Sequence, residues 1–228
     1  VAKLELTPEL REIYESVVKM KKGETAPLVE AEVERGIDAQ VILDFALIAA
    51  MEEVGNLFAD GTYFVPEMLM AAMEMKAGLE VIRPILTASG VPPRGTVVIG
   101  TVRGDVHDIG KNLYGMMMEG AGYNVVDIGV RQTADEFREA LEEHGADILG
   151  MSAMLTTTMP YMKIVVDEMI HRGIRNEYSI FVGGAPLNPE YGASFGADAY
   201  CVDAGVGVAT ANSAIDARAK AHPVPGKQ

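Results

Sequence analysis

Two adjoining stretches decide the fold: Thr96-Val-Val-Ile-Gly-Thr-Val102 and, one residue further on, Gly104-Asp-Val-His-Asp-Ile-Gly-Lys-Asn112. The first is short, apolar and rich in β-branched residues, which predicts a buried strand. The second predicts a loop that leads into a helix opening at Asp108. A strand followed by a loop and a helix is the unit of parallel α/β sheets, and such sheets bind ligands at the loops that follow their strands.

The same pattern repeats to the carboxyl end of the chain. Short apolar stretches predict strands, and helical patterns follow each of them. The expected strands are residues 96–102, 123–128, 146–151, 178–182 and 198–202, and the expected helices are about 108–121, 133–143, 157–173, 188–194 and 206–221. We therefore expect a Rossmann-like, doubly wound α/β domain with a five-stranded parallel sheet over residues 90–228.

The residues before this domain show helical patterns only. Thr7-Pro8-Glu9 combines an N-cap, a proline at the first helical position and an acidic first turn. Further helices are expected at about 25–35, 38–58 and 65–86. Short connections between four helices predict an all-α, four-helix bundle over residues 1–89, joined to the α/β domain by a linker rich in glycine and proline at 89–95.

Composition excludes several classes of protein. The formal net charge is −14, and both halves of the chain are acidic, so the clustered basic residues that bind nucleic acid are missing. The longest apolar stretch, Val41–Met51, is too short to span a bilayer, and the amino terminus has no secretory signal pattern. Cys201 is the single cysteine, which excludes an internal disulfide and suits a reducing compartment. We expect a cytoplasmic protein without nucleic-acid or membrane partners.

His107 is the candidate metal ligand. Asp105 lies two residues earlier, and in an extended segment side chains two apart point the same way, so its carboxylate can hold one ring nitrogen while the other is presented to a metal. The other histidines, His144, His171 and His222, lie far away in the sequence. A bare zinc or iron ion needs three or four protein ligands. A single histidine therefore indicates a metal whose remaining positions are filled by a macrocycle, although a loop histidine without a ligand role is the alternative.

Three motifs carry a resemblance to a known family. The sequence Asp105-x-His107-x-x-Gly110 resembles the cobalamin-binding signature of methionine synthase, B12-dependent mutases and corrinoid methyl-carrier proteins. Two further motifs follow in the sequence. The stretch Gly150–Thr158 resembles the family's Ser-x-Leu-Thr loop, and Phe181-Val-Gly-Gly-Ala185 resembles its Gly-Gly turn. The helical segment is also similar to the bundle that precedes the cobalamin domain in methyl carriers.

The resemblance implies a site for cobalamin or a related corrinoid, with His107 replacing the benzimidazole tail on cobalt. The tail is then buried in the α/β domain. Small residues there leave a channel for it, and side-chain hydroxyls form hydrogen bonds with it. Ordinary turn chemistry is the alternative for each of these residues taken singly. The cofactor-binding residues that we expect are Gly104, Asp105, Val106, His107, Asp108, Ile109, Gly110, Ser152, Leu155, Thr156, Gly183 and Gly184.

Thr158 occupies the position where methionine synthase has a serine that completes an Asp–His–hydroxyl relay. We therefore expect His107, Asp105 and Thr158 to act together. Asp108 is also a candidate helix N-cap, and Lys111 is a candidate for a phosphate or amide contact to the cofactor. For the methionine-rich stretch that begins at Phe64 and enters the helix expected at 65–86, the resemblance implies that Phe64 and Met68 cover the upper face of the corrin, whereas packing in the bundle core is the alternative.

These features imply a free-standing, non-catalytic methyl-carrier subunit. Residues for a mutase barrel, a DNA-binding module or the further modules of methionine synthase are missing from the 228 residues. We expect a methyl group to be carried on cobalt between a substrate-specific methyltransferase and a second methyltransferase with a thiol or tetrahydrofolate-type acceptor. A reductive activation protein is a further expected partner. The alternative is a B12 storage or sensor module without methyl transfer.

Overall fold

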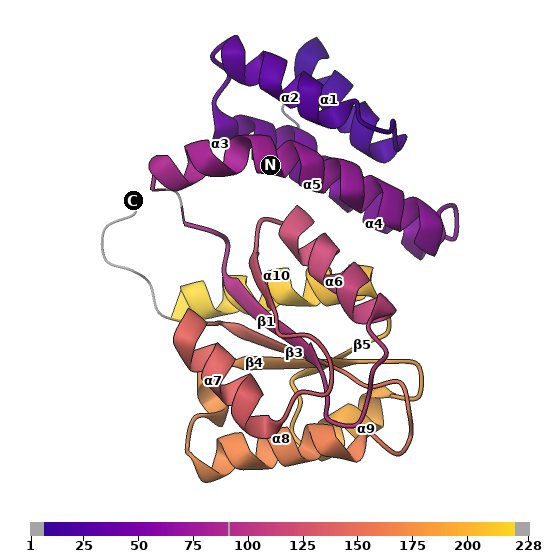
Figure 1. Ribbon diagram of the computed structural model, residues 1–228, viewed down its shortest axis with the longest axis vertical. Coiled ribbons are helices and arrows are strands. Elements are labelled where there is room, and N and C mark those ends of the chain that lie inside the picture. Colours follow the sequence, from indigo (N-terminus) through magenta and orange to yellow (C-terminus); the bar gives the residue numbers. More distant parts are fainter. Residues whose placement is uncertain (1–6, 91, 222–228) are drawn as a thin grey trace. The chain divides into compact units, whose positions relative to one another are not determined.

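A computed structural model of the protein describes residues 7–90 and 92–221 (Figure 1). The chain divides into two compact units, of which the first runs to Pro93 and includes residues 119–122, and the second comprises 94–118 and the residues from Tyr123 onward. The division after Pro93 falls within the linker expected at 89–95, of which Val91 lies outside the described residues.

The first unit is helical. Its helices are α1 (Pro8–Val18), α2 (Thr25–Glu34), α3 (Ala39–Ile42), the π-helix η1 (Leu43–Ile48), α4 (Ala49–Ala59) and α5 (Val65–Ala88). Thr7 caps α1 by accepting a hydrogen bond from Leu10 N at 3.4 Å, and Pro8 follows at the first helical position. The count of four helices is not confirmed, because residues 38–58 contain α3, η1 and α4 in succession.

The core of this unit includes a close contact between α2 and α5. Gly78 in α5 permits it, because a Cβ at this position would lie 3.1 Å from the side chains of both Leu47 and Thr25. The buried Glu74 carboxylate accepts hydrogen bonds from the backbone N–H groups of Gly23 and Thr25, at 2.9 and 3.4 Å. A buried carboxylate paired in this way fixes the start of α2 against α5.

The second unit is the expected parallel sheet. Its strands are β1 (Thr96–Thr101), β2 (Asn124–Asp127), β3 (Ile148–Ser152), β4 (Ser179–Gly183) and β5 (Ala199–Cys201), in the order β2-β1-β3-β4-β5. The helices are α6 (Ile109–Gly120), α7 (Ala134–His144), α8 (Pro160–His171), the short 3₁₀-helix η2 (Arg175–Glu177), α9 (Pro189–Ser194) and α10 (Ala204–Ala221). From β1 the chain continues to β2 on one side and then to β3 on the other side of β1. Ligands of such sheets bind at the point between β1 and β3 where the strand order switches in this way.

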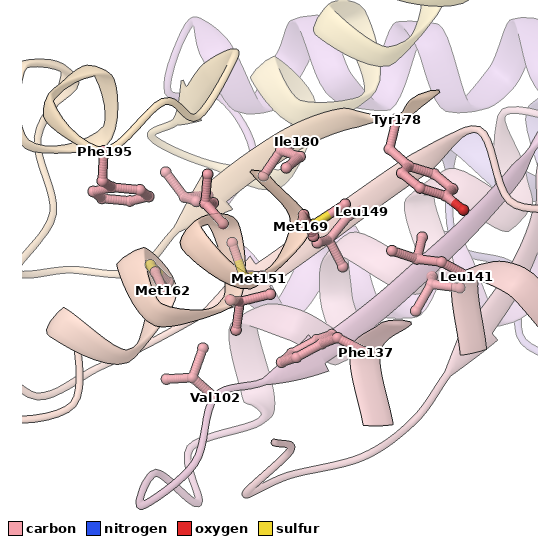
Figure 2. Packing of buried hydrophobic residues seen from close by; sticks show 14 of the residues in the cluster. Val102, Phe137, Leu141, Leu149, Met151, Met162, Met169, Tyr178, Ile180 and Phe195 are labelled. Carbon is pink, nitrogen blue, oxygen red and sulfur yellow. The ribbon is translucent and has the colours of Figure 1, made fainter. Parts of the chain in front are cut away.

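Helices cover both faces of the sheet, with α6 and α10 on one side and α7, α8 and α9 on the other (Figure 1). On the second of these faces, Phe137 and Leu141 from α7 and Met162 and Met169 from α8 pack against strand side chains such as Met151 (Figure 2). These side chains are almost fully buried. This face therefore supplies a large share of the apolar burial that stabilises the unit.

Candidate functional site

The loop after β1 is organised around the buried carboxylate of Asp105. One oxygen, Oδ1, lies 2.6 Å from Nδ1 of His107 and also accepts the backbone N–H of His107 at 3.1 Å. The spacing of two residues lets the same oxygen bind both groups, as in an Asx-turn. Gly104 begins the turn with φ +85°, in the left-handed region that favours glycine.

The second oxygen of Asp105 is held by the loop after β3. Thr158 Oγ1 lies 2.6 Å from Oδ2, and the backbone N–H of Met154 donates to the same atom at 2.8 Å. Thr158 Oγ1 is also 2.9 Å from the carbonyl of Leu155. The hydroxyl has one proton, and the charged carboxylate is the stronger acceptor. The structure thus brings together Asp105, His107 and Thr158, which are up to 53 positions apart in sequence.

Asp105 is a carboxylate under ordinary conditions. Burial by itself raises its pKa, but the hydrogen bonds from Thr158, Met154 N and His107 outweigh burial and hold the pKa below the ordinary value of 3.8. A carboxylate next to Nδ1 of a neutral imidazole places the ring proton on Nδ1. Nε2 is then a free lone pair on a side chain that is 50% exposed. The loop therefore presents one oriented nitrogen donor.

Two backbone contacts hold the loop in place. Thr101, the last residue of β1, donates its buried hydroxyl to the carbonyl of His107 at 2.9 Å. The carbonyl of Asp105 accepts the backbone N–H of Arg131 at 3.2 Å. Sequence reasoning missed Thr101, because a threonine at the end of a strand is common and nothing in the sequence marks its acceptor.

Lys111 takes a different place from the one expected. Its side chain is buried and its ammonium forms an ion pair with Asp127 at the end of β2, and it lies 2.7 Å from Asn112 Oδ1. The lysine therefore ties the first turn of α6 to the edge of the sheet, rather than reaching out to a cofactor. Asp108 precedes this helix, and its carbonyl accepts the N–H of Asn112 at 2.7 Å, as expected of an N-cap residue.

Large apolar side chains are exposed in the segments that follow β1, β3 and β5. Such exposed apolar groups often mark a binding surface. At Gly110 an added Cβ would meet nothing within 4 Å, so the first turn of α6 leaves room for a bulky group. The apolar residues are Val106, Ile109, Met154, Leu155, Val202 and Val206. The carboxyl ends of the strands therefore offer apolar contacts beside the one nitrogen donor.

The predicted channel residues lie at the ends of β3 and β4. Ser152 and Gly183 are neighbours in the sheet register. Gly184 has φ +138°, and a Cβ there would lie 1.9 Å from the carbonyl oxygen of Ala153, so only glycine fits. Thr156 is exposed in the loop before α8. The structure thus places Ser152, Gly183 and Gly184 close together.

The two expected cap residues lie at the start of α5 and differ in their exposure to solvent. Met68 is fully buried, and Phe64 is 65% exposed. The backbone N–H of Phe64 donates to Glu67 Oε2 at 2.9 Å, which anchors the first turn of the helix. Burial of Met68 agrees with the alternative of packing in a core. A role of either residue over a corrin stays a prediction.

The metal-binding side chains at this site suit a metal ion that already has most of its ligands when it binds. Within 7–90 and 92–221, no three side chains of His, Cys, Asp or Glu converge to hold a metal ion. His222 lies outside these residues. The one oriented nitrogen of His107, the open first turn at Gly110 and the exposed apolar groups all fit a cobalt macrocycle that would take one ligand from the protein.

Comparison with known proteins agrees with this geometry. The sequence model described as "B12 binding domain" matches residues 95–214, and a second model with the same description matches residues 9–83. The chain belongs to the B12-binding family. The cofactor of this B12-binding protein is cobalamin or a related corrinoid.

The B12-binding protein also resembles named relatives over most of its length. It is 34% identical to a corrinoid protein of Desulfitobacterium hafniense, over 90% of this chain and 97% of the relative. It is 36% identical to dimethylamine corrinoid protein 1 of Methanosarcina acetivorans, with the same coverage of 90% and 97%. The methanol:cobalamin methyltransferase complex MtaBC from Methanosarcina barkeri matches with a TM-score of 0.81 and 30% identity, over 93% of this chain and 82% of that chain.

None of the helices in the described part of the chain is long and apolar enough to cross a membrane.

Proposed function

We propose that this protein carries a methyl group on a corrinoid between two methyltransferases. One is specific for the methyl donor, and the second passes the methyl group to a thiol or a tetrahydrofolate-type acceptor. The names of the relatives support the first partner, since they include dimethylamine and trimethylamine corrinoid proteins and a methanol:cobalamin methyltransferase complex. A reductive activation protein is a further proposed partner.

The observation that carries the proposal is the arrangement of His107 on Asp105 and Thr158. Bound corrinoid supplies a cobalt centre that accepts and releases a methyl group. His107 Nε2 is the atom that would hold that cobalt. Asp105 Oδ1, 2.6 Å from Nδ1, keeps the ring oriented, and Thr158 at 2.6 Å from Oδ2 fixes the carboxylate. Ligation by His107 is therefore tuned by groups that do not touch the cobalt.

The same three residues can buffer a proton. When Nε2 is not bound to metal it can take a proton from solvent, and the ring becomes an imidazolium. The Asp105 carboxylate, whose pKa lies below its ordinary value, stabilises that positive charge at hydrogen-bond distance. We propose that Asp105 and Thr158 act in this way whenever His107 changes between its bound and free states.

The remaining predicted residues have binding roles in the proposal. Ser152, Gly183 and Gly184 leave space and a hydroxyl for the corrinoid tail, and Leu155 and Thr156 line the loop beside them. Gly104, Val106, Asp108, Ile109 and Gly110 form the surface around His107. Phe64 and Met68 cover the upper face of the corrin.

Reconstitution with hydroxocobalamin tests the ligand role of His107. The wild type should give an absorbance spectrum of histidine-bound cobalamin. His107→Ala should keep part of the cobalamin through the tail channel and lose that spectrum. His144→Ala, which alters an exposed histidine at the end of α7, is the control and should behave as the wild type. A spectrum that His107→Ala leaves unchanged would refute the assignment.

Methyl transfer needs a separate experiment. The reduced, corrinoid-loaded protein is mixed with a candidate methyltransferase and its donor, from methylamines, methanol, methyl thiols, aryl methyl ethers and betaines. A mass increase of the cofactor by one methyl group supports the carrier role. Tight corrinoid binding without methylation by any donor would instead support storage or sensing.

A further inference from the structure

Tyr114, in α6, has a buried hydroxyl without a partner. Within the described residues the oxygen finds no hydrogen-bond partner, although it is shielded from solvent. A buried tyrosine hydroxyl is normally satisfied, because an unmade hydrogen bond in a buried place is costly. This hydroxyl therefore indicates a group that is brought in by something other than the chain itself.

The ring of Tyr114 lies in a slot that two glycines make. A Cβ on Gly150 of β3 would be 3.2 Å from Cε1 of the ring, and a Cβ on Gly207 of α10 would be 2.6 Å from Cε2. The second distance is too short for any side chain. The ring is thus held between the sheet and α10 by residues that have no side chains of their own.

The slot lies on the same face of the sheet as the predicted tail channel. Parallel register aligns Thr101, Ser152, Gly183 and Cys201 in one row across the carboxyl end of the sheet. Gly150 is two residues before Ser152, so it faces the same side one row deeper. Burial raises the pKa of Tyr114 above its ordinary value, and Cys201 and Tyr123 add to the shift. The phenol is therefore a neutral group that can both donate and accept a hydrogen bond.

We propose that the Tyr114 hydroxyl binds the inner edge of the lower base on the corrinoid tail and selects among lower bases. The proposal rests on corrinoid binding as proposed above, with the tail in the channel of Ser152 and Gly183. Because the Tyr114 slot is one row deeper than Ser152, the hydroxyl meets the edge of the base that enters first. A lower base with a hydroxyl on its outer ring forms a hydrogen bond with the Tyr114 hydroxyl. A base with two methyl groups at this edge leaves the Tyr114 hydroxyl without a partner.

A panel of three corrinoids tests this selectivity. The ligands are cobalamin with 5,6-dimethylbenzimidazole, its analogue with 5-hydroxybenzimidazole, and cobinamide, which lacks the base. Dissociation constants are measured by absorbance titration of the full chain. We expect the wild type to bind the hydroxylated analogue about three- to tenfold more tightly than cobalamin, which is the size of one neutral hydrogen bond. Tyr114→Phe should remove this preference and leave the affinity for cobinamide unchanged.

Tyr123→Phe is the matched control. Its hydroxyl is already partnered by Asn212 Oδ1 at 2.9 Å, so loss of the hydroxyl should not alter the selectivity among corrinoids. Thermal unfolding of the ligand-free proteins gives a second readout. Tyr114→Phe should leave the midpoint unchanged or raise it, whereas Tyr123→Phe should lower it. A lowered midpoint for Tyr114→Phe means that the hydroxyl is satisfied within the chain, and this result overturns the proposal.

The failures of the two proposals are distinguishable. If the wild type binds none of the three corrinoids, the proposed function itself is wrong. If it binds all of them and Tyr114→Phe keeps the wild-type order of affinities, only the role of Tyr114 is wrong.

Discussion

The two faces of one sheet differ at its carboxyl end. On the side of α7 and α8, the last positions include Gly100, Met151 and Val182, and the side chain of Phe137 fills the space over Gly100, where a Cβ would lie 2.7 Å from the ring. On the side of α6 and α10, the next residues along the same strands are Thr101, Ser152 and Gly183. Gly100 on the first face makes room for the protein's own core, and we propose that Gly183 on the second face makes room for a ligand. In this proposal, neighbouring residues of one strand serve stability and binding separately.

Phe137→Ala, on the face that α7 and α8 cover, should have the largest effect on stability. The side chain is fully buried in the cluster of Figure 2, and its removal leaves a cavity, so we expect a loss of about 3–5 kcal/mol in the free energy of unfolding. Urea denaturation measures it. Corrinoid affinity of the folded protein should not change. A loss below about 1 kcal/mol would mean that the cluster can collapse around the missing ring.

Asp105→Asn tests the binding side of the sheet. The amide keeps the shape but cannot replace a carboxylate that accepts charge-assisted hydrogen bonds, so we expect a loss of about 2 kcal/mol at neutral pH. Since the pKa of Asp105 is lower in the folded protein than its ordinary 3.8, the carboxylate stabilises the fold above that pH and loses the effect as the pH falls below it. The unfolding free energies of wild type and variant should therefore converge in acid. A difference that does not depend on pH would contradict this account.

The pair Gly100→Ala and Gly183→Ala compares the two faces directly. At Gly100 a Cβ would lie 2.7 Å from Phe137 and 2.8 Å from Ile128, so we expect about 1–3 kcal/mol of destabilisation and unchanged corrinoid affinity. At Gly183 the nearest atom is the carbonyl oxygen of Cys201 at 3.3 Å, so the stability should fall less. Corrinoid affinity should fall instead. Equal effects of the two variants on both quantities would remove the distinction between the faces.

Thr101→Val should have the smallest effect. It keeps the shape of the side chain and removes the hydroxyl that donates to the His107 carbonyl at 2.9 Å, at a cost of about 1 kcal/mol. The absorbance of histidine-bound cobalamin should weaken, because the loop is held less firmly, and Thr101→Ser should restore it. If valine leaves that absorbance as in the wild type, Thr101 has no part in positioning His107.

Much of this protein was readable without its structure, because the signals are local. The alternation of short apolar stretches with helical patterns predicted all five strands, since strand and helix periods are properties of neighbouring residues. The spacing of two residues also predicted that Asp105 would meet His107. The π-helix η1 within 38–58 was not predicted, because the sequence there follows an ordinary helical pattern.

What only the tertiary structure decided are the contacts that depend on register and packing. The hydroxyl of Thr101 on the His107 carbonyl, the amide of Met154 on Asp105 and the ion pair of Lys111 with Asp127 join groups from different segments. The slot that Gly150 and Gly207 form around the unpartnered Tyr114 also joins groups from different segments. No local pattern encodes these contacts, because each requires two elements to be placed within a fraction of an ångström by the packing of the whole sheet. The sequence by itself determined the elements and the motif around His107, and the packed sheet determined which side chains meet there.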